Sequence, residues 1–201
     1  NDSSIPNYDW TGGSVWVSSK NRWFCWTGDI TGFSSGIVSL VDTSDAAGNH
    51  LCKQGGLYFL HGVRDALDSP NEWHYDDTLR DLYLWTPDGS APSGVEVKSR
   101  LYGFKLSNRQ YIHLQDLEFF ATSIETNQSS DSHVFDNLRM RHVYHSTKAE
   151  NNYGSQRRTG LVLSGTNHEL INSEVAYTSG SGVFLEGSGH WVVNNYVHDN
   201  N

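Results

Sequence analysis

The chain has 201 residues, of which 36% are hydrophobic and 12% aromatic, so it can form a packed core and is not disordered. Its formal net charge of −9 argues against a phosphate-backbone partner, and no run approaches the ~20 apolar residues that a membrane span needs. We therefore expect no nucleic acid and no membrane span. Nineteen glycines, seven tryptophans, ten tyrosines and only four prolines are typical of a secreted or cell-surface all-β protein with many tight turns.

Residues 1–55 predict a strand-rich insertion or small β subdomain. Ser14–Val17 and Gly36–Leu40 alternate apolar and polar residues between clusters of turn-forming residues, which indicates a meander of short strands. Cys25 and Cys52 lie in this region. They would form a disulfide in an oxidising compartment or remain free thiols, and both alternatives stay open.

Residues 56–96 predict connecting strands and a turn. A strand is expected at Gly56–Leu60 and a short helical turn from Val63 to Leu67. Two further strands are expected at Glu72–Asp76 and Leu82–Trp85. This segment should lead into a domain with a different sequence texture.

Residues 97–201 contain a repeated pattern of an apolar residue, Asn or Asp, and another apolar residue. The separations between the polar anchors are 21, 35 and 22 residues, and an insertion at Ser146–Arg158 lengthens the middle interval. Such a period with β patterning predicts a parallel β-solenoid, in which each Asn adopts a left-handed bend and hydrogen-bonds the Asn of the neighbouring coil. The anchors are Asp116, Asn137, Asn172 and Asn194.

These repeats resemble those of right-handed parallel β-helix proteins of the pectin-lyase-like superfamily. Ala66–Asp76 and Leu82–Gly89 are similar to a segment that precedes the coils in large bacterial glycoside hydrolases, and Gly180–Gly187 and Asn194–Asp199 match the coil pattern. The resemblance covers roughly residues 56–201. It implies an all-β, right-handed parallel β-helix with an N-terminal strand-rich insertion. Relatives of this kind are longer, so we expect the chain to be a segment of a longer protein.

Two carboxylates are candidates for glycoside cleavage. Matching the strands that follow each anchor places Glu125, Ser164 and Glu186 in one outward column, with the two glutamates as the catalytic pair and Ser164 at the substrate. Coils ~4.8 Å apart would separate the glutamates by about 10 Å, just beyond the ~6.5 to 9.5 Å of an inverting pair. The alternative is that both glutamates are solvated surface residues.

The rival chemistry is β-elimination from a uronic acid, which needs a cation at the sugar carboxylate and a base for the C5 proton. A hydrolase needs no cofactor, whereas the lyase alternative leaves room for a Ca²⁺ ion. Tyr153 and Trp191 are candidates for stacking on a sugar, and no residue cluster has the spacing of a protein metal site. The candidates for elimination are Tyr144, His145, Lys148, Arg157 and Arg158.

The sequence thus favours a secreted polysaccharide-degrading enzyme, a glycoside hydrolase that binds glycan along a β-helix groove. A polysaccharide lyase is the first alternative. A non-catalytic glycan-binding adhesin or fibre protein is the second, because the fold alone does not determine the function. The glycan, its linkage and the oligomeric state stay open.

Overall fold

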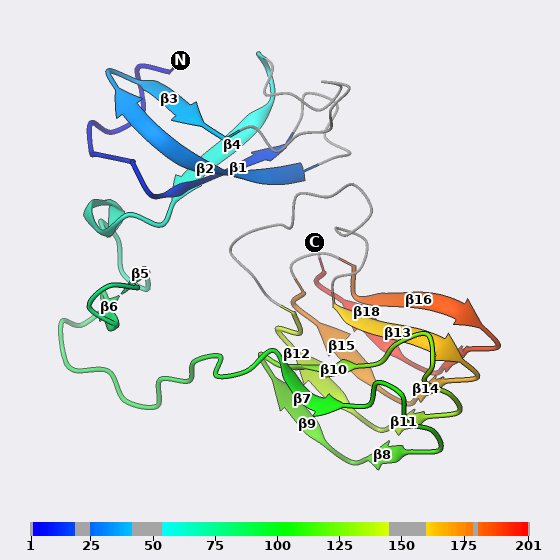
Figure 1. Cartoon of the computed structure of the whole chain (residues 1–201). Coiled ribbons are helices and arrows are strands. Elements are labelled where there is room, and N and C mark those ends of the chain that lie inside the picture. Colours follow the sequence, from blue (N-terminus) through cyan, green and yellow to red (C-terminus); the bar gives the residue numbers. More distant parts are fainter. Residues whose placement is uncertain (1, 19–24, 42–53, 145–159, 179–180, 201) are drawn as a thin grey trace. The chain divides into compact units, whose positions relative to one another are not determined.

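The computed structural model describes residues 2–18, 25–41, 54–144, 160–178 and 181–200 (Figure 1). The chain is nearly all-β and divides after Val95 into two compact units. Among the described residues, no helix is both long enough and apolar enough to cross a membrane.

The first unit contains an antiparallel sheet with strand order β3-β2-β1-β4. Its strands are β1 (Ser14–Ser18), β2 (Cys25–Ser34), β3 (Ile37–Leu40) and β4 (Leu57–His61). The strands expected near residues 14, 36 and 56 are confirmed, and β4 joins this sheet by pairing with β1. The core of the sheet is formed by Trp10, Val15, Val17, Trp26 and Ile30.

The first unit also contains a short 3₁₀ helix, Arg64–Ala66, and the hairpin of β5 (Trp73–Asp76) and β6 (Asp81–Leu84). The predicted helical turn and the two predicted strands are confirmed. The question of a disulfide is not settled by the fold, because Cys52 lies outside the described residues.

The second unit is a parallel β-solenoid of about four coils, as the repeats predict. Each coil contributes one strand to each of three faces. The first sheet is β8-β11-β14-β17, the second sheet is β9-β12-β15-β18, and the third face consists of the pairs β7-β10 and β13-β16. The strands are β7 (Tyr102–Lys105), β8 (His113–Gln115), β9 (Glu118–Phe120), β10 (Ser123–Glu125), β11 (Val134–Asp136), β12 (Arg139–Arg141), β13 (Leu161–Thr166), β14 (Glu169–Ile171), β15 (Glu174–Ala176), β16 (Val183–Ser188), β17 (Trp191–Val193) and β18 (Tyr196–His198).

Apolar side chains in register fill the interior of the solenoid. The middle residue of each short strand points inward and lies against the middle residue of the next coil, because alternate residues of a strand face opposite sides. Fully burying each such side chain stabilises the fold by about 1.5–3 kcal/mol. The inward rows are Leu114, Phe135 and Leu170 in the first sheet and Phe119, Met140 and Val175 in the second.

The four anchors share one edge of the stack, as predicted. Their φ angles are 56°, 51°, 52° and 56° in chain order, so all four are left-handed. Two further columns of left-handed residues, which the sequence analysis missed, mark the other two corners of the coil. Successive left-handed corners around the first two sheets are therefore five residues apart. These columns are Tyr111, Ser132, Asn167 and Gly189, and Ala121, His142, Tyr177 and Asp199.

Side-chain hydrogen bonds connect the anchors from coil to coil. Asn137 Nδ2 donates to Asp116 Oδ1 at 2.7 Å, and Asn194 Nδ2 donates to Asn172 Oδ1 at 2.7 Å. Between them, Asn172 Nδ2 donates to Asp136 Oδ1 at 2.9 Å rather than to Asn137. A carboxylate is a stronger hydrogen-bond acceptor than an amide oxygen, which explains why Asn172 donates to Asp136 and not to the anchor Asn137. The ladder lies on the exposed edge of the stack and not in its interior.

Two substitutions at Asn172 separate the ladder from the bend. We expect Asn172→Gly to lose about 1 kcal/mol of unfolding free energy, because the left-handed bend is kept while the hydrogen bonds are lost. Asn172→Ala should lose about 1 kcal/mol more, because alanine is strained in that conformation. Urea denaturation of both variants measures the two contributions. A glycine variant as stable as the parent would show that the ladder contributes nothing.

Candidate functional site

The structure brings Ser164 and Glu186 together on the third face. They are register neighbours in β13 and β16, and Ser164 Oγ donates to Glu186 Oε2 at 2.8 Å. Ser164 is buried, so its hydroxyl is already used within the protein. Glu125 lies opposite Lys105 in the register of β10 with β7. The sequence predicts Glu125, Ser164 and Glu186 in one column. The described contacts join Ser164 to Glu186 and do not include Glu125.

Thr126 is the residue that links coil 2 to β13. Its Oγ1 accepts the backbone N–H of Ser164 at 2.8 Å and donates to the carbonyl of Val162 at 3.1 Å. In the same way, Ser123 Oγ donates to the carbonyl of Gly160 at 3.3 Å. Between β10 and β13, hydroxyl groups thus make the hydrogen bonds to backbone groups that a neighbouring strand would otherwise make. The third face is therefore divided into the pairs β7-β10 and β13-β16.

Most of the candidates for elimination lie outside the described residues. They are His145, Lys148, Arg157 and Arg158, and Tyr153 of the stacking candidates lies there too. Tyr144 is described and half-buried, and the Lys98 ammonium lies 5.9 Å from the centre of its ring. The lyase set therefore stays a prediction.

Trp191 is exposed on the first sheet. Its neighbour Val192 is in register with the buried Leu170, so Trp191 points outward, beside Glu169 of the preceding coil. The remaining candidate aromatic residue is thus on a different face from Glu186.

The second sheet and its adjoining corner carry a row of rings that the sequence analysis did not assemble. We call Phe120, His142, Tyr177, His198 and Tyr196 the aromatic column. Centroid separations along it are 5.4, 5.2, 5.9 and 3.9 Å, so each ring contacts the next from coil 1 to coil 4. Phe120, Tyr177 and Tyr196 are exposed. The column therefore offers apolar ring surface along the length of the solenoid.

Ion pairs cross the strands beside this column. Arg141 donates through Nε and Nη2 to Glu174 Oε1, at 2.9 and 2.7 Å, which lowers the pKa of Glu174. Arg139 Nη1 lies 3.3 Å from Glu118 Oε1, and its Nε lies 3.5 Å from Glu174 Oε2. The Arg141 guanidinium is 6.0 Å from the ring centre of Tyr177. Glu174 is thus ionised at neutral pH and held in place by both arginines.

His198 ends the row between two carboxylates. Its Nδ1 is 2.8 Å from Asp199 Oδ2, and its Nε2 is 3.4 Å from Glu174 Oε1. These contacts orient the imidazole, and Tyr196 stacks on it. Chemically, the face combines aromatic rings, which are suited to cover the C–H side of a sugar ring, with charged groups that are able to hydrogen-bond hydroxyl groups.

Three histidines connect adjacent coils by hydrogen bonds and do not belong to the candidate site. His133, His168 and His190 stack at 5.0 and 5.2 Å between centroids, and each Nδ1 accepts the backbone N–H of the preceding coil. Burial lowers the pKa of His133 and His168. His190 is thereby a hydrogen-bonding residue of a coil bend.

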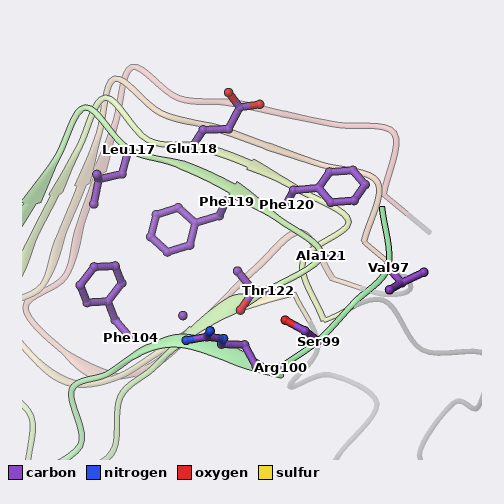
Figure 2. A pocket seen from close by; sticks show the side chains of 11 residues that line it. Val97, Ser99, Arg100, Phe104, Leu117, Glu118, Phe119, Phe120, Ala121 and Thr122 are labelled. Atoms are coloured by element: carbon purple, nitrogen blue, oxygen red, sulfur yellow. The ribbon is translucent and has the colours of Figure 1, made fainter. Parts of the chain in front are cut away.

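A cavity of about 290 Å³ lies at the first coil. Figure 2 shows Phe104, Leu117 and Phe119 directed into the coil, with Glu118 outside it. This cavity is the open end of the apolar interior and lies apart from Ser164 and Glu186. Within the described ranges, no group of three or more His, Cys, Asp or Glu side chains could hold a metal ion.

Comparison with protein families, characterised proteins and solved structures finds no match for this chain. The parallel β-solenoid therefore stands on the geometry of the coils themselves.

Proposed function

We propose that the solenoid binds a polysaccharide along the outward side of the second sheet, over the aromatic column. The observation that carries the proposal is the unbroken series of ring contacts from Phe120 to Tyr196. Coils repeat every ~4.8 Å, a spacing comparable with the length of one sugar residue in an extended glycan. Successive rings can therefore contact successive sugars of a chain that runs along the solenoid.

The charges of this face favour a neutral polysaccharide over a polyuronate. Arg139 and Arg141 are paired with Glu118 and Glu174, and Asp199 adds a further carboxylate. An added sugar carboxylate would therefore meet guanidinium groups that are already neutralised. The net charge of the chain, −9, acts in the same direction.

Hydrolysis of a glycan bound along the third face, and not along the second sheet, is the second candidate function. It needs one carboxyl group as acid and another as base, and the outward Glu186, held by Ser164, supplies one carboxylate on the third face. Elimination needs an unpaired cation for the uronate, and both described arginines of the second sheet are engaged by glutamates. Hydrolysis therefore ranks before elimination, and binding without cleavage remains the adhesin alternative.

Two tyrosine variants test the binding face. Tyr177 and Tyr111 both have φ of 56° and both occupy solenoid corners, but Tyr177 belongs to the aromatic column. We expect Tyr177→Ala to weaken binding of a neutral polysaccharide about tenfold, from ~1.5 kcal/mol of lost stacking, and Tyr111→Ala to leave it unchanged. Trp191→Ala shows whether the first sheet contributes. Isothermal titration calorimetry against neutral and uronic-acid polysaccharides supplies the affinities.

The same incubations distinguish the three functions. New reducing ends alone indicate hydrolysis, absorbance of unsaturated ends indicates elimination, and binding without either indicates an adhesin. Turnover that persists in the double variant Glu125→Ala, Glu186→Ala would exclude both glutamates from catalysis. Equal losses of affinity for Tyr177→Ala and Tyr111→Ala, or no binding to any polysaccharide, would contradict the proposed face.

A further inference from the structure

A second candidate site lies in the first unit, on one face of the β5–β6 hairpin. An open cleft of about 480 Å³ is found there, which is within the ~300–1,000 Å³ typical of small-molecule sites. The cleft combines two aromatic residues with two residues of opposite charge. These residues are Tyr83, Trp85, Arg64 and Asp65.

The strand pairing places both aromatic residues on the same side of the hairpin. β6 ends at Leu84, and Trp85 extends its hydrogen-bonded ladder. The Trp85 N–H donates to the Glu72 carbonyl at 2.9 Å, and the Trp85 carbonyl accepts the Asn71 N–H at 2.8 Å. Alternate residues of a strand face the same side, so Trp85 lies beside Tyr83. Trp85 is 45% exposed, which leaves its ring accessible to a ligand.

The Arg64 guanidinium lies over the Tyr83 ring, 4.0 Å from the ring centre. This cation–π contact holds the guanidinium in the cleft, next to Trp85. Within the part of the chain that the structure describes, Arg64 forms no ion pair with a carboxylate. Arg139 and Arg141 of the second sheet, by contrast, are both engaged by glutamates. The N–H groups of Arg64 can therefore donate to a ligand.

The charges around the cleft favour a neutral ligand. Residues 64–85 carry six acidic and two basic side chains, so they repel an anion. Arg64 supplies hydrogen-bond donors and Asp65 supplies acceptors beside the rings. A ligand with an apolar face and with hydroxyl groups at its edge matches this combination, and a neutral pyranose has both features.

We propose that this cleft binds a single neutral sugar ring, as a free sugar or as one terminal residue of a glycan. Trp85 covers the C–H face of the ring, Arg64 donates to a hydroxyl oxygen, and Asp65 accepts from a hydroxyl group. The site goes beyond the proposed function, because it lies in the first unit and takes one sugar, whereas the aromatic column takes a chain. It does not depend on the aromatic column.

Small neutral sugars test the cleft in the full chain. The probes are the methyl glycosides of glucose, galactose, mannose and xylose, and methyl glucuronoside is the charged match of the glucose probe. We expect at least one neutral probe to shift the indole N–H signal of Trp85 in NMR spectra, with saturation in the millimolar range. Methyl glucuronoside should bind about tenfold more weakly than methyl glucoside or not at all.

Four variants separate the cleft from other surfaces. Trp85→Ala and Arg64→Gln should each weaken binding of the neutral probe about tenfold. Trp73→Ala is the matched control, because Trp73 is 54% exposed on the opposite side of the same hairpin from His74 and its register partner Tyr83. Tyr177→Ala should leave this binding unchanged, since Tyr177 belongs to the aromatic column.

Several results would overturn the inference. They are the failure of every neutral probe to shift the Trp85 signal, equal binding of methyl glucoside and methyl glucuronoside, and unchanged affinity in Arg64→Gln. A loss in Trp73→Ala or Tyr177→Ala as large as that in Trp85→Ala would also overturn it. Loss of polysaccharide binding in Tyr177→Ala with the small probe still bound would instead show that the cleft and the aromatic column are separate sites.

Discussion

Gly165→Ala is expected to destabilise the solenoid by about 4 kcal/mol or more. Gly165 is buried in β13 with φ of 122°, and an added Cβ would lie 2.1 Å from the carbonyl oxygen of Ser130 and 2.9 Å from that of Asn127. Both contacts are with backbone, so no side chain can move aside. The substituted residue would also have to hold a backbone conformation that L side chains rarely adopt.

An alanine substitution should be equally unfavourable at Gly187, the register neighbour of Gly165 in the next coil. Gly187 is in register with Gly165 and has φ of 120°, and a Cβ there would lie 1.8 Å from the Gly165 carbonyl oxygen. Backbone therefore approaches backbone at this place in consecutive coils, which only glycine permits.

Gly94→Ala, which lies in the first unit, is the control for a positive φ without close contacts. Gly94 has φ of 68°, but nothing lies within 4 Å of its added Cβ, so it should lose only about 1 kcal/mol. Urea denaturation followed by circular dichroism compares the two variants. Similar midpoints for Gly165→Ala and Gly94→Ala would show that the backbone contacts at Gly165 do not limit the fold.

The stack of coils was predictable because one corner of every coil is occupied by Asn or Asp. Asp116, Asn137, Asn172 and Asn194 are all short polar residues that tolerate a left-handed backbone, so their intervals stand out in the sequence. The other corners accept Ala121, His142 and Tyr177 in the same conformation, because stacking on adjacent coils holds the backbone there. Their spacing repeats, but their side chains do not.

The aromatic column was missed for a related reason. Phe120 and His198 belong to strands of the second sheet, whereas His142 and Tyr177 occupy the corner beside it. The rings therefore do not all occupy the same position of the repeat. Two of them could have been found from the sequence, because His142 and Tyr177 follow Ala121 at the same separations as the anchors follow one another. On the third face, Thr126 meets β13 through its hydroxyl, a contact that strand matching alone does not reveal.

His168→Leu is expected to lose about 3 kcal/mol of unfolding free energy. His168 Nδ1 accepts the His133 N–H at 3.2 Å, and its Nε2 donates to the Ser164 carbonyl at 2.9 Å. Leucine would leave two buried backbone groups without these partners, at about 1–3 kcal/mol each. His113→Leu is the control, because His113 is exposed on the first sheet. Equal stability of the two variants would show that the buried histidine stack is dispensable.

The same histidines make stability depend on pH in a defined window. Burial lowers the pKa of His133 and His168 from the ordinary 6.5, so the folded chain keeps both rings neutral while the unfolded chain binds protons. Stability is therefore complete above pH ~6.5 and falls as the pH drops below it, by up to ~1.4 kcal/mol per pH unit for each ring. Unfolding free energies at pH 7.5 and 5.5 should differ less in His168→Leu than in the parent, because one of the two titrating rings is gone. An equal difference in both proteins would assign the pH dependence to other groups.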